Sequence, residues 1–370
     1  MKRILLATTA IFGLSVSSAM ASDITISGSF ELGYVNSSQN DAYVDTTASN
    51  PTGTQAAVAG TPLRDFVAAE MKNGSSMYVQ SDVNISFSST TDSGLTMTMN
   101  YGLDENGAND SANTDDINFS LSGDFGEIYA TSTTDDSATR RLDIEAAYTP
   151  DEMSTRHTNE DTAGYNSAFG EFAGGAVTSG TIISYFLPSV IDGVAAGVSY
   201  SNAGTNSKAN ATEWAVQYKN DFSGGSYTIH YGKGSHDGNG ALAADSEVVD
   251  HSGEASGYGV EINFGNFTVG SESTTYDYAR PAGAVTVDLS ATSVKYVWGD
   301  ITLAGNIEEK DVSLANAVAT DDDVQRTAFS ISYAIAPGLT ANITTSSTKE
   351  DVGVNQDTDD VTVFALNATF

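Results

Sequence analysis

Residues 77–103 read MYVQSDVNISFSSTTDSGLTMTMNYGL, and this stretch decides the fold. Apolar and polar residues take turns on both sides of the tetrapeptide TDSG at 91–94. Because successive side chains of a β-strand point to opposite faces, a period of two predicts strands with one apolar and one polar side. The tetrapeptide is typical of a tight turn. The stretch therefore predicts a hairpin of two long antiparallel strands.

The same pattern repeats along the chain. Residues 23–35 alternate in the same way, and further alternating segments extend to the C-terminus. Short turns are predicted at 91–94, 123–126, 188–193, 221–225, 265–266, 299–300 and 336–338. Between successive short turns lie two strands joined by a longer connection rich in Asp, Asn and Gly. Seven short turns and the closure between the chain ends make eight hairpins, hence sixteen strands.

Strands of this kind, with short turns at one end and long loops at the other, are the signature of an outer-membrane barrel. Aromatic residues predicted near strand ends would form girdles at the lipid headgroups: Tyr34, Tyr101, Tyr185, Tyr200, Tyr218, Tyr231, Trp298 and Phe370. A soluble sandwich or β-solenoid also alternates, but it needs neither an even ladder of strands nor two aromatic belts. The predicted fold is an all-β, 16-stranded antiparallel transmembrane β-barrel. Its last strand ends on Phe370 and resembles the targeting signal read by the barrel-assembly machinery.

The N-terminus and the composition agree with export. Residues 1–21 have a basic start, an apolar run and a small-residue cleavage site, which predicts a Sec signal peptide. Residues 22–370 would then form the barrel, in contact with the lipid of a Gram-negative outer membrane. The chain has no cysteine, so neither disulfides nor thiolate metal sites are expected. A net charge of −33 excludes nucleic acid as a partner, because phosphate binding requires a basic surface.

The third long connection, about residues 133–180, is the longest segment that does not alternate. It carries nine carboxylates against three arginines. We expect it to fold into the barrel and to set the size and charge of the pore. The constriction residues predicted there are Arg140, Arg141, Asp143, Glu145, Arg156, Glu160, Asp161 and Glu171. Two fates of the arginines stay open: they face the pore, or they pair with nearby carboxylates such as Asp151 and hold the loop to the wall.

Three segments of the first 130 residues resemble the general porins of the alphaproteobacterial, Rhodobacter-type group. They are DITISGS at 23–29, VNISFSSTTDSG at 83–94 followed by Leu95, and FSLSGDFGEI at 119–128. The resemblance implies a homotrimeric diffusion porin for ions and small hydrophilic solutes, with its third long loop folded inside as the constriction. GEFAGG at 170–175 is similar to the Pro-Glu-Phe-Gly-Gly element of enterobacterial constriction loops, without the Pro and one Gly.

The resemblance also implies a cluster of arginines on the early strands, facing the acidic loop. This chain departs from that pattern, since the polar faces predicted for its first four strands carry neither Arg nor Lys. The residues predicted to line the lumen wall are Glu31, Asp82, Asn84, Lys219, His230, Lys295 and Arg326. Carboxylates in excess at a constriction raise the local concentration of cations and repel anions. The sequence therefore predicts cation preference.

A barrel of this kind is also compatible with other functions. A barrel enzyme needs His with Asp or Ser in a constellation, and no motif surrounds the four histidines, His157, His230, His236 and His251. No enzyme is therefore predicted. A non-conducting barrel that serves as an adhesin or anchor, and a substrate-specific channel, stay open as alternatives.

No cofactor is predicted, with one reservation for calcium. The Asp-rich runs at 115–116, 321–323 and 357–360 offer the oxygen ligands that Ca²⁺ prefers. None has the spacing of a known calcium loop. Solvated negative charge is the alternative interpretation of these runs.

Overall fold

The computed structural model describes residues 22–40, 74–106, 117–131, 137–144, 181–202, 210–236, 252–278, 285–314, 322–352 and 355–370. These residues form one short helix, α2 (Ala138–Arg141), and sixteen strands: β1 (Ser22–Asn40), β2 (Gly74–Thr90), β3 (Thr96–Asn106), β4 (Ile117–Gly123), β5 (Gly126–Thr131), β6 (Thr181–Phe186), β7 (Val194–Asn202), β8 (Ala211–Phe222), β9 (Gly225–His236), β10 (Gly253–Phe264), β11 (Phe267–Tyr278), β12 (Val285–Trp298), β13 (Ile301–Leu314), β14 (Asp322–Ala336), β15 (Leu339–Val352) and β16 (Asn355–Thr369).

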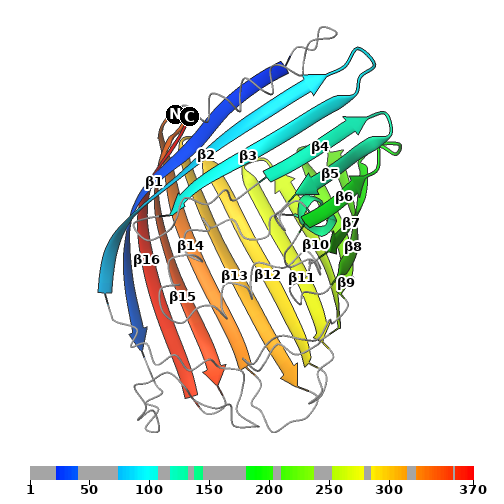
Figure 1. The fold of residues 1–370 in the computed structure, drawn as a ribbon. Helices are drawn as coiled ribbons and strands as arrows, with labels where there is room; N and C mark the ends of the chain where they lie inside the picture. The colour runs from blue at the N-terminus through cyan, green and yellow to red at the C-terminus, as the bar shows by residue number, and fades with distance from the viewer. Residues whose placement is uncertain are drawn as a thin grey trace, which may run out of the picture.

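Each strand pairs with its sequence neighbours, and β1 pairs with β16 to close the barrel (Figure 1). The pairing is antiparallel throughout, as the alternating hairpins predict. β1 begins opposite the end of β2, so both ends of the described chain lie at the rim that carries the short turns. This confirms the predicted 16-stranded antiparallel barrel.

The seven predicted short turns are confirmed. Each has a glycine with positive φ at the turn or at its edge: Gly94, Gly126, Gly193, Gly224, Gly265, Gly299 and Gly338. Positive φ is a conformation that glycine adopts without steric cost, whereas other L-residues are strained there. The positions of the short turns can therefore be predicted from the glycines in the sequence.

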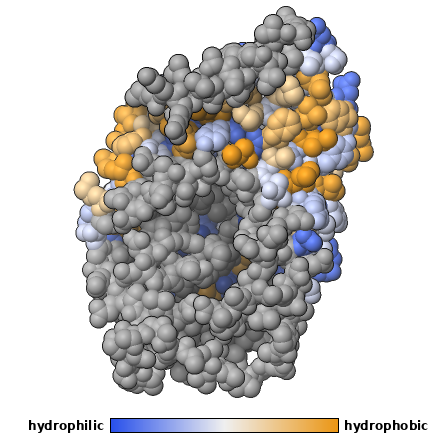
Figure 2. Space-filling model, viewed as in Figure 1, coloured by the Kyte–Doolittle hydropathy of each residue, from blue (hydrophilic) through white to orange (hydrophobic). Residues whose placement is uncertain are grey.

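The faces of the barrel follow the predicted alternation. Apolar side chains on the outside are exposed, such as Ile26 at 62 % and Met77 at 71 %, whereas the inward face carries many buried Ser, Thr, Asn and Glu side chains. Hydrophobic residues gather on the outer surface of the upper part of the barrel in Figure 2. A membrane barrel needs this arrangement, because its outer surface meets lipid and its lumen meets water. Among the described residues, no helix is long and apolar enough to cross a membrane.

The predicted positions of the aromatic residues along the strands were wrong in part. Near the short turns the outer face carries pairs such as Phe222–Phe264 and Phe267–Tyr296, which were not predicted. Tyr34 and Tyr231, by contrast, lie well inside β1 and β9 rather than at their ends. About 9–11 tilted residues suffice to cross the membrane. Longer strands therefore continue past the headgroups, and the second girdle falls within them.

The wall differs in height around the barrel. β4, β5 and β6 have six or seven residues, whereas β12 to β16 have 14 or 15 (Figure 1). The first two strands are longer than predicted, so the first long connection spans 41–73 instead of about 36–75. The third long connection runs from 132 to 180, in agreement with the predicted loop. Of that loop the structure describes residues 137–144.

Candidate pore-lining site

The described segment of the third loop, residues 137–144, lies against the inner wall of the barrel. The backbone N–H of Ala138 donates to Ser199 Oγ on β7 at 2.7 Å. Both the N–H and the hydroxyl of Thr139 donate to Glu213 Oε1 on β8, at 3.1 and 2.9 Å. The first N–H groups of a helix have no partner within it. Here two wall residues supply those partners, so the helix is anchored at its start.

Apolar packing and one arginine hold the same segment. Ala138 and Leu142 pack in a buried cluster with Tyr129, Phe186 and Ala215 of the wall. The Arg141 guanidinium lies over the Tyr129 and Phe186 rings, at 4.6 and 4.4 Å from their centroids. It also pairs with Glu127 on β5, with its Nη2 3.1 Å from Oε2. Arg141 therefore ties the described segment to the wall.

The loop then follows a row of inward-facing residues across neighbouring strands. The row consists of consecutive register partners from β8 to β14: Gln217, His230, Gly259, Glu272, Ala291, Glu308 and Arg326. We call it the inner belt. Gln217 Nε2 donates to the carbonyls of Leu142 and Asp143, at 3.0 and 2.9 Å.

The next contacts follow the inner belt strand by strand. Asp143 Oδ1 lies 2.8 Å from His230 Nδ1. Ile144 lies over Gly259, where an added Cβ would approach its Cδ1 to 2.7 Å. Beyond Gly259, Ile144 packs into a buried cluster that includes Tyr276 and Leu289. The loop therefore lies flat on β8 to β10, because the belt offers a polar anchor and then a residue without a side chain.

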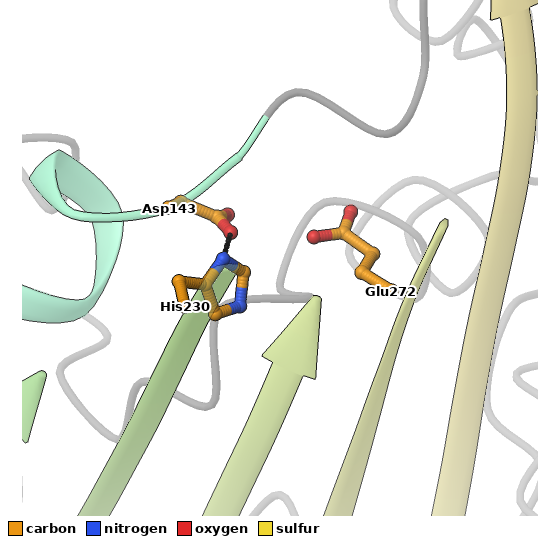
Figure 3. Close-up of side chains that lie close together, drawn as sticks. All are labelled: Asp143, His230 and Glu272. Carbon is orange, nitrogen blue, oxygen red and sulfur yellow. Dashed lines mark ion pairs between the residues drawn. The ribbon is translucent and has the colours of Figure 1, made fainter. Parts of the chain in front are cut away.

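Two buried carboxylates on the inner belt have different surroundings. Glu308 forms an ion pair with Arg326 and accepts a hydrogen bond from Asn306. Glu272 is turned toward Asp143 and His230 (Figure 3). Glu272 Oε2 and His230 Nε2 are buried and have no hydrogen-bond partner among the described residues. One end of the belt is thus neutralised within the wall, and the other meets the loop.

Comparison with known proteins decides the family. The Gram-negative porin family matches residues 7–353, which is most of the chain. The chain belongs to the Gram-negative porin family. It is therefore an outer-membrane β-barrel of a Gram-negative bacterium and not an enzyme. Among curated proteins, none matches this porin in sequence.

Solved porins share the fold of this porin at low sequence identity. The in-vitro folded OmpT of Vibrio cholerae, described as a trimer form, has a TM-score of 0.64 at 10 % identity, covering 95 % of this chain and 100 % of that one. An anion-selective porin from Comamonas acidovorans has a TM-score of 0.61 at 14 %, with coverages of 95 % and 100 %. A triple mutant of the Rhodobacter blastica porin has a TM-score of 0.53 at 14 %, covering 94 % and 100 %. At these identities the likeness concerns the fold alone.

The remaining predicted wall residues of the porin lie on the inward face. Asp82 accepts a hydrogen bond from Ser29 on β1 at 2.7 Å, and Glu31 and Asn84 share its side of the sheet. Lys219 and Lys295 lie three residues before the ends of β8 and β12, next to the short turns. Lys295 lies four residues from Ala291 of the inner belt, whereas Lys219 is the next inward-facing residue after Gln217 of the belt. The loop residues Glu145, Arg156, Glu160, Asp161 and Glu171 lie outside the described residues.

Several residues that hold the loop were not predicted. They are the inward-facing polar residues Glu127, Ser199, Glu213 and Gln217. The buried wall residues Glu272 and Glu308 were not predicted either. A signal existed, because a polar residue at an inward position of an alternating strand faces the lumen. Applying this rule to all polar residues of the alternating strands, as well as to the basic ones, would have found them.

Proposed function

We propose that this porin is a diffusion channel for ions and small hydrophilic solutes with a preference for cations. The observation that carries the proposal is the third-loop segment docked on the inner wall beside the buried carboxylates Glu213 and Glu272. A loop held inside a water-filled barrel narrows it, and the charges at the narrowest point set selectivity. The anion-selective Comamonas porin has a similar fold, so the fold does not decide whether a porin prefers cations or anions. The side chains at the constriction must determine this preference.

The charges of the described wall favour cations. Arg326 is paired with Glu308, and Arg141 is paired with Glu127, so each of these two cations is offset by a carboxylate. Lys295 lies by a short turn, whereas Lys219 lies two residues from Gln217 of the inner belt. The first four strands carry no Arg or Lys. Negative charge therefore predominates beside the docked segment, and this raises the local concentration of cations.

We infer further that the porin is a homotrimer of the Rhodobacter type. Support comes from the motifs at 83–95 and 119–128, and from the trimeric form of the Vibrio OmpT. The low wall of β4 to β6 and the exposed apolar outer face of β1 to β3 are suited to contact with a neighbouring barrel. Lipid would then surround the taller strands.

Single-channel recording in a planar bilayer with a KCl gradient tests the proposal. We expect large conductance steps in groups of three and a reversal potential that favours K⁺. Arg140→Gln should increase the preference for K⁺ more than Lys295→Gln, because Arg140 lies on the docked segment whereas Lys295 lies by a short turn, four residues from Ala291 of the inner belt. A preference for chloride would overturn the proposed selectivity. A folded but silent barrel would instead favour an adhesin or anchor.

A further inference from the structure

His230, Asp143 and Glu272 bring three potential metal ligands together inside the barrel. One ligand atom of each residue lies within 4.8 Å of the others. His230 comes from β9, Glu272 from β11 and Asp143 from the third loop (Figure 3). The two wall residues are both register partners of Gly259 on β10, and they therefore flank a position that has no side chain.

Two polar atoms of this cluster are buried without a partner, whereas Asp143 Oδ1 and His230 Nδ1 both accept the backbone N–H of Ile144. Glu272 is 6 % exposed and His230 3 % exposed. Glu272 Oε2 and His230 Nε2 have no hydrogen-bond partner within the described part of the chain. Burying such atoms is costly unless they are paired. Glu272 also faces the second carboxylate, Asp143. The charge of Arg140 acts on Glu272 as well, and a cation bound between the two carboxylates would further offset their repulsion.

We propose that this cluster binds one divalent transition-metal ion of the zinc class. Zinc binds His nitrogen and carboxylate oxygen at about 2.0–2.2 Å, so two ligands on one ion lie roughly 3–3.5 Å apart. The three side chains reach that spacing by small movements. Water from the lumen completes the four-coordinate shell. The ligand set selects zinc over calcium and magnesium, because an imidazole nitrogen suits transition metals and those two ions prefer oxygen alone.

A metal ion here would join the loop to two strands of the wall. Asp143 is already oriented, because its Oδ1 accepts the backbone N–H of Ile144 at 2.7 Å and lies beside His230. Bound zinc would add two positive charges beside the docked segment. Zinc would therefore stabilise the loop and weaken the attraction of the pore for other cations. Only this effect on conduction rests on the proposed function, since binding itself depends on the three side chains.

The test is isothermal titration of the refolded porin in detergent with ZnCl2, in an excess of MgCl2. Magnesium occupies the acidic surface that binds any divalent cation. We expect one zinc site per barrel. His230→Gln and Glu272→Gln should each weaken the affinity by about ten-fold or more, as the loss of a metal-site residue does.

Two matched controls remove an imidazole and a carboxylate that face the lumen outside the proposed zinc site. His236→Gln changes the other histidine of β9, and Glu261→Gln changes an inward carboxylate of β10. Both should leave zinc affinity unchanged. Absence of zinc binding by the wild-type porin in magnesium would overturn the proposal, as would controls that weaken binding as much as His230→Gln does.

A second measurement uses the wild-type porin alone, so it remains informative if the variants fold poorly. Zinc should raise the temperature at which the wild-type barrel unfolds, and calcium at the same concentration should not. An equal shift with both ions would overturn the proposal, because it would indicate only screening of the acidic surface. These readouts do not involve conductance, so their failure is distinguishable from the failure of the proposed channel function.

Discussion

Glu308 and Glu272 occupy the same register row of the inner wall, separated by Ala291, but their surroundings differ. Both are buried, at 1 % and 6 % exposed. Glu308 is paired with an arginine of the adjacent strand, and Glu272 faces a histidine and a loop aspartate. The wall at β13 and β14 is thus neutralised by its own residues. The wall at β9 to β11 is completed by the third loop.

This difference indicates that different strands of one barrel stabilise the wall and position the loop. Strands that pair their own charges are stable regardless of the loop. Strands that leave polar groups for the loop to satisfy give it a defined seat, because a buried polar group without a partner is costly. The stability of the barrel is therefore expected to depend most on Glu308 and its ion pair. The position of the loop is expected to depend on Glu272 and on the neighbouring residues that anchor the loop.

Arg326→Met should have the largest effect on stability. It leaves the buried carboxylate of Glu308 without its cation, and breaking such a pair typically costs about 3–5 kcal/mol. The measurement is the free energy of unfolding in urea for the barrel refolded into lipid vesicles. The double variant Glu308→Gln with Arg326→Met should recover most of the loss, since it strands no charge. Equal stability of the single and double variants would contradict the role of the pair.

Glu213→Ala should release the loop without destabilising the barrel. It removes the acceptor of two donors of Thr139, and an unsatisfied buried group costs about 1–3 kcal/mol. Trypsin should then cleave after Arg140 or Arg141 about ten-fold faster than in the wild type, because cleavage follows the population of the opened segment. Peptide mass spectrometry identifies the cut. Glu309→Ala, on the outer face of β13, serves as the control and should leave the rate unchanged.

Gly259→Ala should have the smallest effect. The added Cβ meets the flexible end of Ile144, so we expect a loss of about 1 kcal/mol in docking of the loop, at the low end of overpacking costs. The same trypsin assay should show an increase of a few-fold. Gly305→Ala on β13 is the matched control, since the nearest atom to its Cβ would be 3.6 Å away. If both variants behaved alike, Ile144 would not be seated at Gly259.

Most of the fold could be predicted from the sequence, because each hairpin carries its own evidence. The alternation at 77–103 identifies the faces of β2 and β3, and turn residues such as Gly94 mark where the chain reverses. The heights of the girdles could not be predicted in the same way. Alternation indicates which side of a strand meets lipid, but it does not indicate where along a long strand the headgroups lie.

The candidate site could be predicted only in part. The position of His230 on the inward face follows from the period of β9. Its proximity to Glu272 depends on the register of β9, β10 and β11, and alternation alone is satisfied by any shift of two residues. Its contact with Asp143 joins residues 87 positions apart, and no local pattern encodes that distance. Tertiary packing decides both contacts.

The most direct test of the docked loop uses the absence of cysteine from this chain. Arg140→Cys places a unique thiol on the segment that lies on the inner wall. A membrane-impermeant methanethiosulfonate, added during single-channel recording, should reduce the conductance in discrete steps. The same reagent on Gln325→Cys, which faces outward on β14, should leave the conductance unchanged. Labelling at position 140 with no change in conductance would contradict a third loop that borders the pore.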